Sequence, residues 1–127
     1  MAKVILVIDD DPDFAEAVCT LLESNGFEVD HAENGEKGFE KAIANKPNLI
    51  LLDVMMTTKT EGFDLSRKLK SHENTKAIPV VLVTGIRRDM NIPYTFEPDS
   101  EWLPVRAILE KPIRPETLLK IVNEQIA

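Results

Sequence analysis

The feature that most constrains the fold is a set of three uninterrupted apolar runs. They are Val4–Ile8, Leu49–Leu52 and Val80–Val83. Each has the length of a strand, and none alternates apolar with polar residues as a strand with one wet face does. Strands that are apolar on both sides lie in the middle of a parallel sheet with helices on both faces. The chain is therefore predicted to be an α/β protein.

Two further segments have the mixed pattern of edge strands. Phe27–His31 alternates apolar and polar residues, and Val105–Ile108 does so in part. Helix signals separate the strands. The predicted helices run from Asp11-Pro12 to Asn25-Gly26, from Asn34-Gly35 to just before Pro47, from Gly62-Phe63 to before Pro79, and from Pro115 to Ile126.

The segment 86–104 breaks this rhythm. It contains Pro93, Pro98 and Pro104, and no helical period survives three prolines. We expect an atypical proline-rich segment here, in place of much of a fourth helix.

Five strands joined by helices predict a doubly wound sheet with right-handed crossovers. Because the three fully apolar strands must be central, the expected arrangement is flavodoxin-like, with strand order 2-1-3-4-5. At 127 residues the chain is expected to be a single domain over 1–127 with no attached output domain.

Polar side chains follow four of the predicted strands. In such sheets the ligand site lies outside the carboxyl ends of the strands, at the switch point between strands one and three. Any one of these residues alone would be read as a cap or a surface group, whereas the topology makes them converge. They are Asp9, Asp10 and Asp11 after the first strand, Asp53 after the third, Thr84 after the fourth and Lys111 after the fifth.

Crowded carboxylates repel one another unless a cation lies between them. Asp9, Asp10 and Asp53 offer the hard oxygen ligands that Mg²⁺ prefers. A Lys111 ammonium can neutralise a phosphoryl oxygen, and a Thr84 hydroxyl can donate to another. These are the parts for phosphoryl transfer, with Asp53 as the candidate nucleophile.

Four motifs in order resemble the receiver domain of two-component response regulators, of the stand-alone chemotaxis-regulator type, from about Lys3 to Ile126. They are Val7-Ile8-Asp9-Asp10-Asp11-Pro12, Leu51-Leu52-Asp53-Val54-Met55-Met56, Val83-Thr84-Gly85 and Glu110-Lys111-Pro112. The resemblance implies that Asp53 accepts a phosphoryl group, in the presence of Mg²⁺, from a sensor histidine kinase or a phosphotransfer protein.

The same resemblance assigns the other residues. Asp10 would bind Mg²⁺ directly, Asp9 mainly through water, and the main-chain carbonyl of Met55 would be a further ligand. Lys111 would pair with the phosphoryl group, and Thr84 would move to hydrogen-bond it after transfer. A cis peptide bond before Pro112 is implied by the family and is permitted by the sequence.

The chain departs from the family pattern at four places. Thr57 replaces the usual Pro four residues after the acceptor, and the loop to Gly62 has one residue more than is usual. Ile108 stands where a Tyr or Phe commonly reports phosphorylation. In the proline-rich segment, Tyr94, Phe96 and Trp102 either contact a partner or pin the loop to the sheet. Met55 and Ile86, apolar at the two positions flanking the hydrolytic water, predict a long-lived aspartyl-phosphate.

The net charge and the apolar runs argue against a nucleic-acid-binding protein and a membrane protein, and the remaining reactive residues are expected to be structural. A net charge of −7 argues against a nucleic-acid surface, because neutralising phosphates needs clustered Lys and Arg. The longest apolar run is too short to insert into a membrane, and without a signal-type start the chain is expected to be cytoplasmic. Cys19 is expected to be a core residue, His31 a surface or packed histidine without a metal role, and His72 exposed.

Three functions remain open on this sequence. The first is a signalling receiver that catalyses only its own phosphorylation and dephosphorylation and is otherwise no enzyme. The second is a pseudo-receiver that only binds partners. The third is a phosphohydrolase of the haloacid-dehalogenase type, which would need a late acidic metal pair where only Glu116 and Glu124 remain. Output would pass to a downstream partner protein, through a homodimer, or onward along a phosphorelay.

Overall fold

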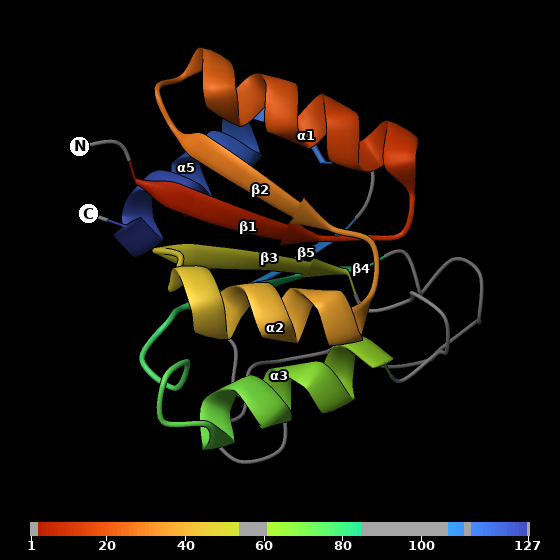
Figure 1. Ribbon diagram of the computed structural model, residues 1–127. Coiled ribbons are helices and arrows are strands. Elements are labelled where there is room, and N and C mark those ends of the chain that lie inside the picture. Colours follow the sequence, from red (N-terminus) through yellow and green to blue (C-terminus); the bar gives the residue numbers. More distant parts are fainter. Residues whose placement is uncertain (1–2, 54–60, 85–106, 111–112, 127) are drawn as a thin grey trace.

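The structure is a computed structural model that describes residues 3–53, 61–84, 107–110 and 113–126 (Figure 1). A five-stranded, wholly parallel sheet has the order β2-β1-β3-β4-β5, which confirms the predicted topology. The strands are β1 (Val4–Ile8), β2 (Glu28–Ala32), β3 (Leu49–Asp53), β4 (Val80–Thr84) and β5 (Ala107–Glu110). The helices are α1 (Pro12–Ser24), α2 (Gly35–Asn45), α3 (Glu61–Ser71) and α5 (Pro115–Ile126).

Helices cover both faces of the sheet, with α1 and α5 on one side and α2 and α3 on the other (Figure 1). Alternate residues of the central strands belong to two hydrophobic cores, one on each face of the sheet. In β1, Ile5 and Val7 pack with α1 and α5, whereas Leu6 and Ile8 pack with α2 and α3. Because a shift of one residue would exchange these two sets, burial on both faces holds the strand register and hence the residues at the strand ends.

The strand ends reach further than the sequence predicted. β3 and β4 include Asp53 and Thr84, because both residues still pair across the sheet, Asp53 with Val83 and Thr84 with Glu110. β2 lies one residue later than Phe27–His31, and β5 ends at Glu110 instead of Ile108. The proline-rich segment 86–104, with its three aromatic residues, lies outside the described residues.

The helix starts agree with the predicted caps. The Asp11 carboxylate accepts hydrogen bonds from the backbone N–H groups of Asp13 (3.1 Å) and Phe14 (3.3 Å), so it caps α1 directly beside the end of β1. Asn34 caps α2 by accepting from the N–H of Lys37 at 2.8 Å. These caps fix where the chain leaves the sheet edge.

A close approach seats α2 on the sheet. A Cβ atom added at Gly38 would lie 2.5 Å from Cδ1 and 2.8 Å from Cγ1 of Ile8. Only glycine allows the helix to lie this near to β1. The contact is with Ile8, the residue that precedes Asp9.

Candidate phosphoryl-transfer site

The candidate site begins where β1 and β3 end. Ile8 and Leu52 are partners in the parallel register, and the next residues are Asp9 and Asp53. Both carboxylates therefore leave the sheet at the same edge, as predicted for the carboxyl ends of neighbouring parallel strands. Asp9 is 1% exposed and Asp53 is 5% exposed, so both charged groups are set into the protein, whereas Asp10 is exposed.

Three carboxylates meet at this edge. Asp9, Asp10 and Asp53 each offer one oxygen, and these oxygens all lie within 4.8 Å of one another. Like charges at this separation and burial repel strongly unless a cation or protons compensate them. An all-oxygen donor set with one solvent-exposed member matches a hard divalent ion that keeps part of its water shell, as Mg²⁺ does. The donor chemistry thus fits the predicted metal.

Backbone contacts hold Asp9 in this arrangement. Its N–H donates to the carbonyl of Ala32 on β2 at 3.0 Å, and its Oδ1 accepts from the N–H of Asp11 at 2.8 Å. Asp11 in turn caps α1. The loop that carries the acid pair is therefore connected both to the edge strand and to the first turn of α1.

His31, which the sequence predicts to be structural, touches this loop. The Nε2 atom of His31, on β2, lies 2.8 Å from the main-chain oxygen of Asp9. His31 was expected to be a surface or packed histidine, and its half-buried position agrees with that expectation, but the contact with Asp9 was not predicted. The contact follows from the long-range register of β2 against β1, because His31 pairs with Val7, two residues before Asp9.

The other predicted site residues are placed only in part. Thr84 ends β4, one residue beyond Val83, the partner of Asp53, so its main chain reaches the same edge. Ile108 lies on β5 opposite Leu82. Met55 and Lys111 lie outside the described residues, as do Thr57 and Ile86.

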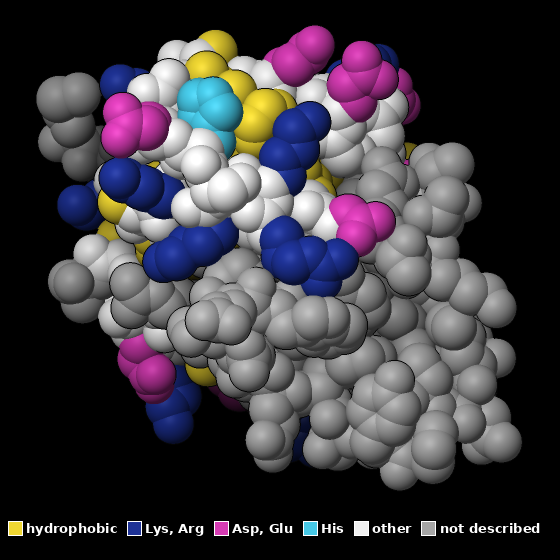
Figure 2. Space-filling view, turned by 90° about the horizontal axis from the view of Figure 1, so that it is seen from below, with side chains coloured by type: hydrophobic (Ala, Val, Ile, Leu, Met, Phe, Trp, Pro, Cys, Tyr) yellow, Lys and Arg dark blue, Asp and Glu magenta, His cyan; other side chains and the backbone are white. Residues whose placement is uncertain are grey.

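Basic and acidic side chains are mixed on the face that α2 and α3 form (Figure 2). Arg67 pairs with Asp64 at 2.6 Å, and Lys76 lies 3.5 Å from Glu73. Such exposed pairs contribute little to stability.

The expected absence of a nucleic-acid surface stays a prediction. Within the described ranges, no helix has the length and apolar character needed to cross a bilayer.

Comparisons with known proteins identify the family of the chain. The family model for the response regulator receiver domain matches residues 5–123. The chain is 36% identical over 126 residues to the protein PilH of Pseudomonas aeruginosa, covering 97% of both chains. It is 40% identical over 82 residues to the DNA-binding transcriptional regulator RpaA of Synechocystis, of which it spans only 34%.

Solved structures show the same architecture. A CheY-like response regulator receiver domain from Methanospirillum hungatei is 27% identical, with a TM-score of 0.80 over 99% of this chain and 94% of that one. A sensor protein from Polaromonas is 26% identical, with a TM-score of 0.82 over 98% of this chain and 95% of that one.

Proposed function

The chain belongs to the response regulator receiver domain family, and on that premise we propose that Asp53 is its phosphoacceptor. The observation that carries the proposal is the convergence of Asp9, Asp10 and Asp53 at the ends of β1 and β3. Asp53 is the member of the trio that a fully buried strand presents, so its carboxylate is held in place by the core. A rigidly held nucleophile beside a metal-binding acid pair is suited to in-line phosphoryl transfer.

The proposed step is a substitution at phosphorus. A carboxylate oxygen of Asp53 forms a bond to the phosphorus atom of a phosphohistidine or of a small acyl phosphate. The bond from phosphorus to the histidine nitrogen, or to the acyl oxygen, breaks, and its electron pair leaves with the donor. The product is an aspartyl-phosphate, and the phosphoryl group changes carrier without any redox change.

The residues that would hold Mg²⁺ are Asp9, Asp10 and Asp53, together with the main-chain carbonyl of Met55. A bound Mg²⁺ supplies positive charge that offsets the carboxylates and the phosphoryl oxygens. Lys111 is proposed to pair with a phosphoryl oxygen, and Thr84 to donate a hydrogen bond to another. The backbone position of Thr84 at the shared edge supports its assignment.

Receiver domains are signalling modules and not enzymes that turn over a metabolite. We propose that this one catalyses only the gain and loss of its own phosphoryl group, in the cytoplasm. Its donor would be a sensor histidine kinase or a phosphotransfer protein, and its output would pass to a downstream partner protein, a homodimer or a further relay. The family match gives no support to the pseudo-receiver or to the phosphohydrolase.

Incubation with Mg²⁺ and acetyl phosphate, followed by intact mass spectrometry, tests the proposal. The protein is expected to gain the mass of one phosphoryl group. The gain should vanish when Mg²⁺ is removed by EDTA and in the Asp53→Asn variant, which keeps the shape of the side chain without the nucleophilic oxygen. An unmodified wild-type protein, or an equal gain in Asp53→Asn, would contradict it.

A further inference from the structure

The hydrogen bond between His31 and Asp9 has a defined direction. A main-chain carbonyl oxygen can only accept, so at 2.8 Å the Nε2 atom of His31 must carry the hydrogen and donate it. The acceptor belongs to a residue of the acidic cluster, and the donor comes from a different strand. The ring therefore ties the edge strand β2 to the loop that carries the acid pair.

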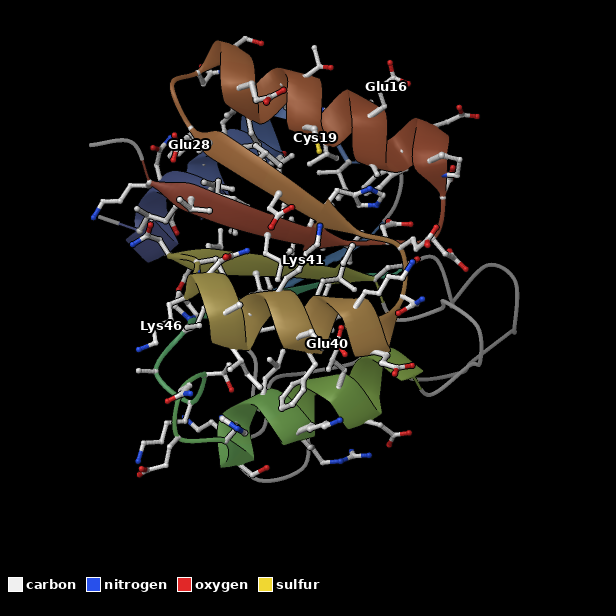
Figure 3. All side chains as sticks on the ribbon, viewed as in Figure 1. Glu16, Cys19, Glu28, Glu40, Lys41 and Lys46 are labelled. Atoms are coloured by element: carbon white, nitrogen blue, oxygen red, sulfur yellow. The ribbon has the colours of Figure 1, made fainter. Side chains whose placement is uncertain are left out.

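The main chain of His31 is itself fixed on both sides. Its N–H donates to Oδ1 of Asp30 at 2.9 Å, and its carbonyl accepts from Nζ of Lys41 at 2.7 Å. Nζ of Lys41 also lies 2.9 Å from Oδ1 of Asp30, and the side-chain amide of Asn45 donates to Oδ2 at 3.1 Å. Figure 3 shows Lys41 extending from α2 toward β2. Because β2 is an edge strand, Asp30 and Lys41 thereby pair the main-chain N–H and carbonyl of His31, which a further strand would otherwise pair.

The contact acts on Asp10 as well as on Asp9. The carbonyl that His31 holds belongs to the peptide unit joining these two residues, and that unit is planar. Fixing its oxygen therefore fixes the N–H of Asp10 and limits the directions in which the Asp10 side chain can leave the chain. Asp10 is exposed, so burial does not orient it as it orients Asp9 and Asp53.

We propose that His31 is a positioning residue for the cation site: its Nε2–H holds the Asp9–Asp10 peptide so that both carboxylates face Asp53. This inference rests on the proposed function, since it assigns a role in the same site. His31 is not itself a ligand. It acts through the main chain of a ligand, with its own main chain held by Asp30 and Lys41.

Binding of Mn²⁺ alone tests the inference, because the free ion can be counted by electron paramagnetic resonance. His31→Phe keeps a flat ring but has no donor, and it should weaken Mn²⁺ binding about tenfold, as the loss of outer hydrogen-bond partners does in other metal sites. His31→Gln, which can place an amide N–H near the same position, should recover most of the affinity. His72→Phe, the same change at the other histidine, should bind as the wild type does.

Urea unfolding in EDTA shows that each variant is folded at the assay conditions, so a loss of affinity is not a loss of structure. A second measurement needs no variant. The ¹⁵N shifts of the wild-type His31 ring should show hydrogen on Nε2.

The outcomes separate the two claims. If the wild type binds no Mn²⁺, the proposed function fails together with the inference. If the wild type binds Mn²⁺, the proposed function stands, and three results would show that His31 is not a positioning residue. They are an affinity of His31→Phe for Mn²⁺ within twofold of the wild type, an affinity of His31→Gln as weak as that of His31→Phe, and an Nε2 atom that carries no hydrogen.

Discussion

Asp9 and Asp53 stand next to each other across two parallel strands, each one residue beyond the register pair Ile8–Leu52. With Asp10 they bring carboxylate oxygens within 4.8 Å of one another, and two of the three side chains are almost fully buried. Carboxylates at this separation repel one another, and a divalent cation would relieve that repulsion. The stability of the protein should therefore depend on this cluster in a measurable way.

Neutralising the central carboxylate should stabilise the metal-free protein. Asp53→Asn removes one of three mutually repelling charges, so in EDTA its free energy of unfolding should exceed that of the wild type by about 1 kcal/mol. Added Mg²⁺ should raise the urea midpoint of the wild type, because it binds only the folded state, and should raise that of the variant much less. Asp64→Asn, on the surface of α3, is the matched control and should show neither effect. Equal midpoints for wild type and Asp53→Asn in EDTA would contradict the repulsion.

The close packing of α2 on β1 predicts a costly alanine. Gly38→Ala improves helix propensity, yet the new Cβ would meet Ile8 at 2.5 Å and 2.8 Å. The steric overpacking should outweigh the gain in helix propensity and lower the free energy of unfolding by about 1–2 kcal/mol in urea titrations. Ile8→Val in the same protein should recover part of the loss, since it removes Cδ1, the nearer of these two atoms. Glu40→Ala, exposed on the same helix, should change stability by less than about 0.5 kcal/mol. A stabilised Gly38→Ala would show that α2 can move away without cost.

The Asp30–Lys41 pair should contribute a pH-dependent part of the stability. Burial raises the pKa of Asp30, but the hydrogen bond and charge of Lys41, with hydrogen bonds from His31 and Asn45, outweigh it and leave the pKa below its ordinary value of 3.8. A lowered folded-state pKa means that this stabilisation is complete above the ordinary value and is lost as the pH falls through the folded-state pKa.

The wild type should therefore exceed Asp30→Asn in unfolding free energy at about pH 6, by no more than about 1 kcal/mol because the pair is partly exposed. The difference should shrink as urea titrations are moved below pH 3.8, the ordinary value. A difference that is constant over this range would mean that the ion pair is not its source.

The sequence predicts the strands of this protein better than the contacts around them. Asp9 and Asp53 could be placed because uninterrupted apolar runs can only be central strands, and parallel strands end at a common edge. The strand ends were placed one or two residues short, since Asp53 and Thr84 are polar and yet still pair within the sheet. Polarity alone does not mark where a ladder ends.

The contacts of His31 could not be predicted in the same way. They depend on the register of β2 against β1, which sets His31 opposite Val7, and on α2 placing Lys41 over the edge strand. Both are long-range pairings that leave no local pattern. The alternation of Phe27–His31 correctly indicated an edge strand, but not that one of its polar residues touches the acid pair.

From the apolar character of Met55 and Ile86 we predict slow loss of phosphate. The family resemblance places Met55 and Ile86 beside the path of the hydrolytic water, and neither can orient water by a hydrogen bond. The phosphorylated protein should persist for much longer than seconds in Mg²⁺, and Met55→Asn with Ile86→Glu should speed phosphate release at least about tenfold. Release can be followed with a phosphate-binding dye after the donor is removed. Complete loss from the wild type within seconds would refute this prediction.

The assignment of the phosphoryl group to Asp53 can be tested by locating the acyl phosphate. Borohydride reduces an aspartyl-phosphate to homoserine, so treatment of the phosphorylated protein followed by peptide mass spectrometry reads the modified position. Homoserine is expected at position 53 alone, formed only when Mg²⁺ and a phosphodonor are both present. Homoserine at position 9 or 10, or none in a protein that has gained a phosphoryl group, would contradict it.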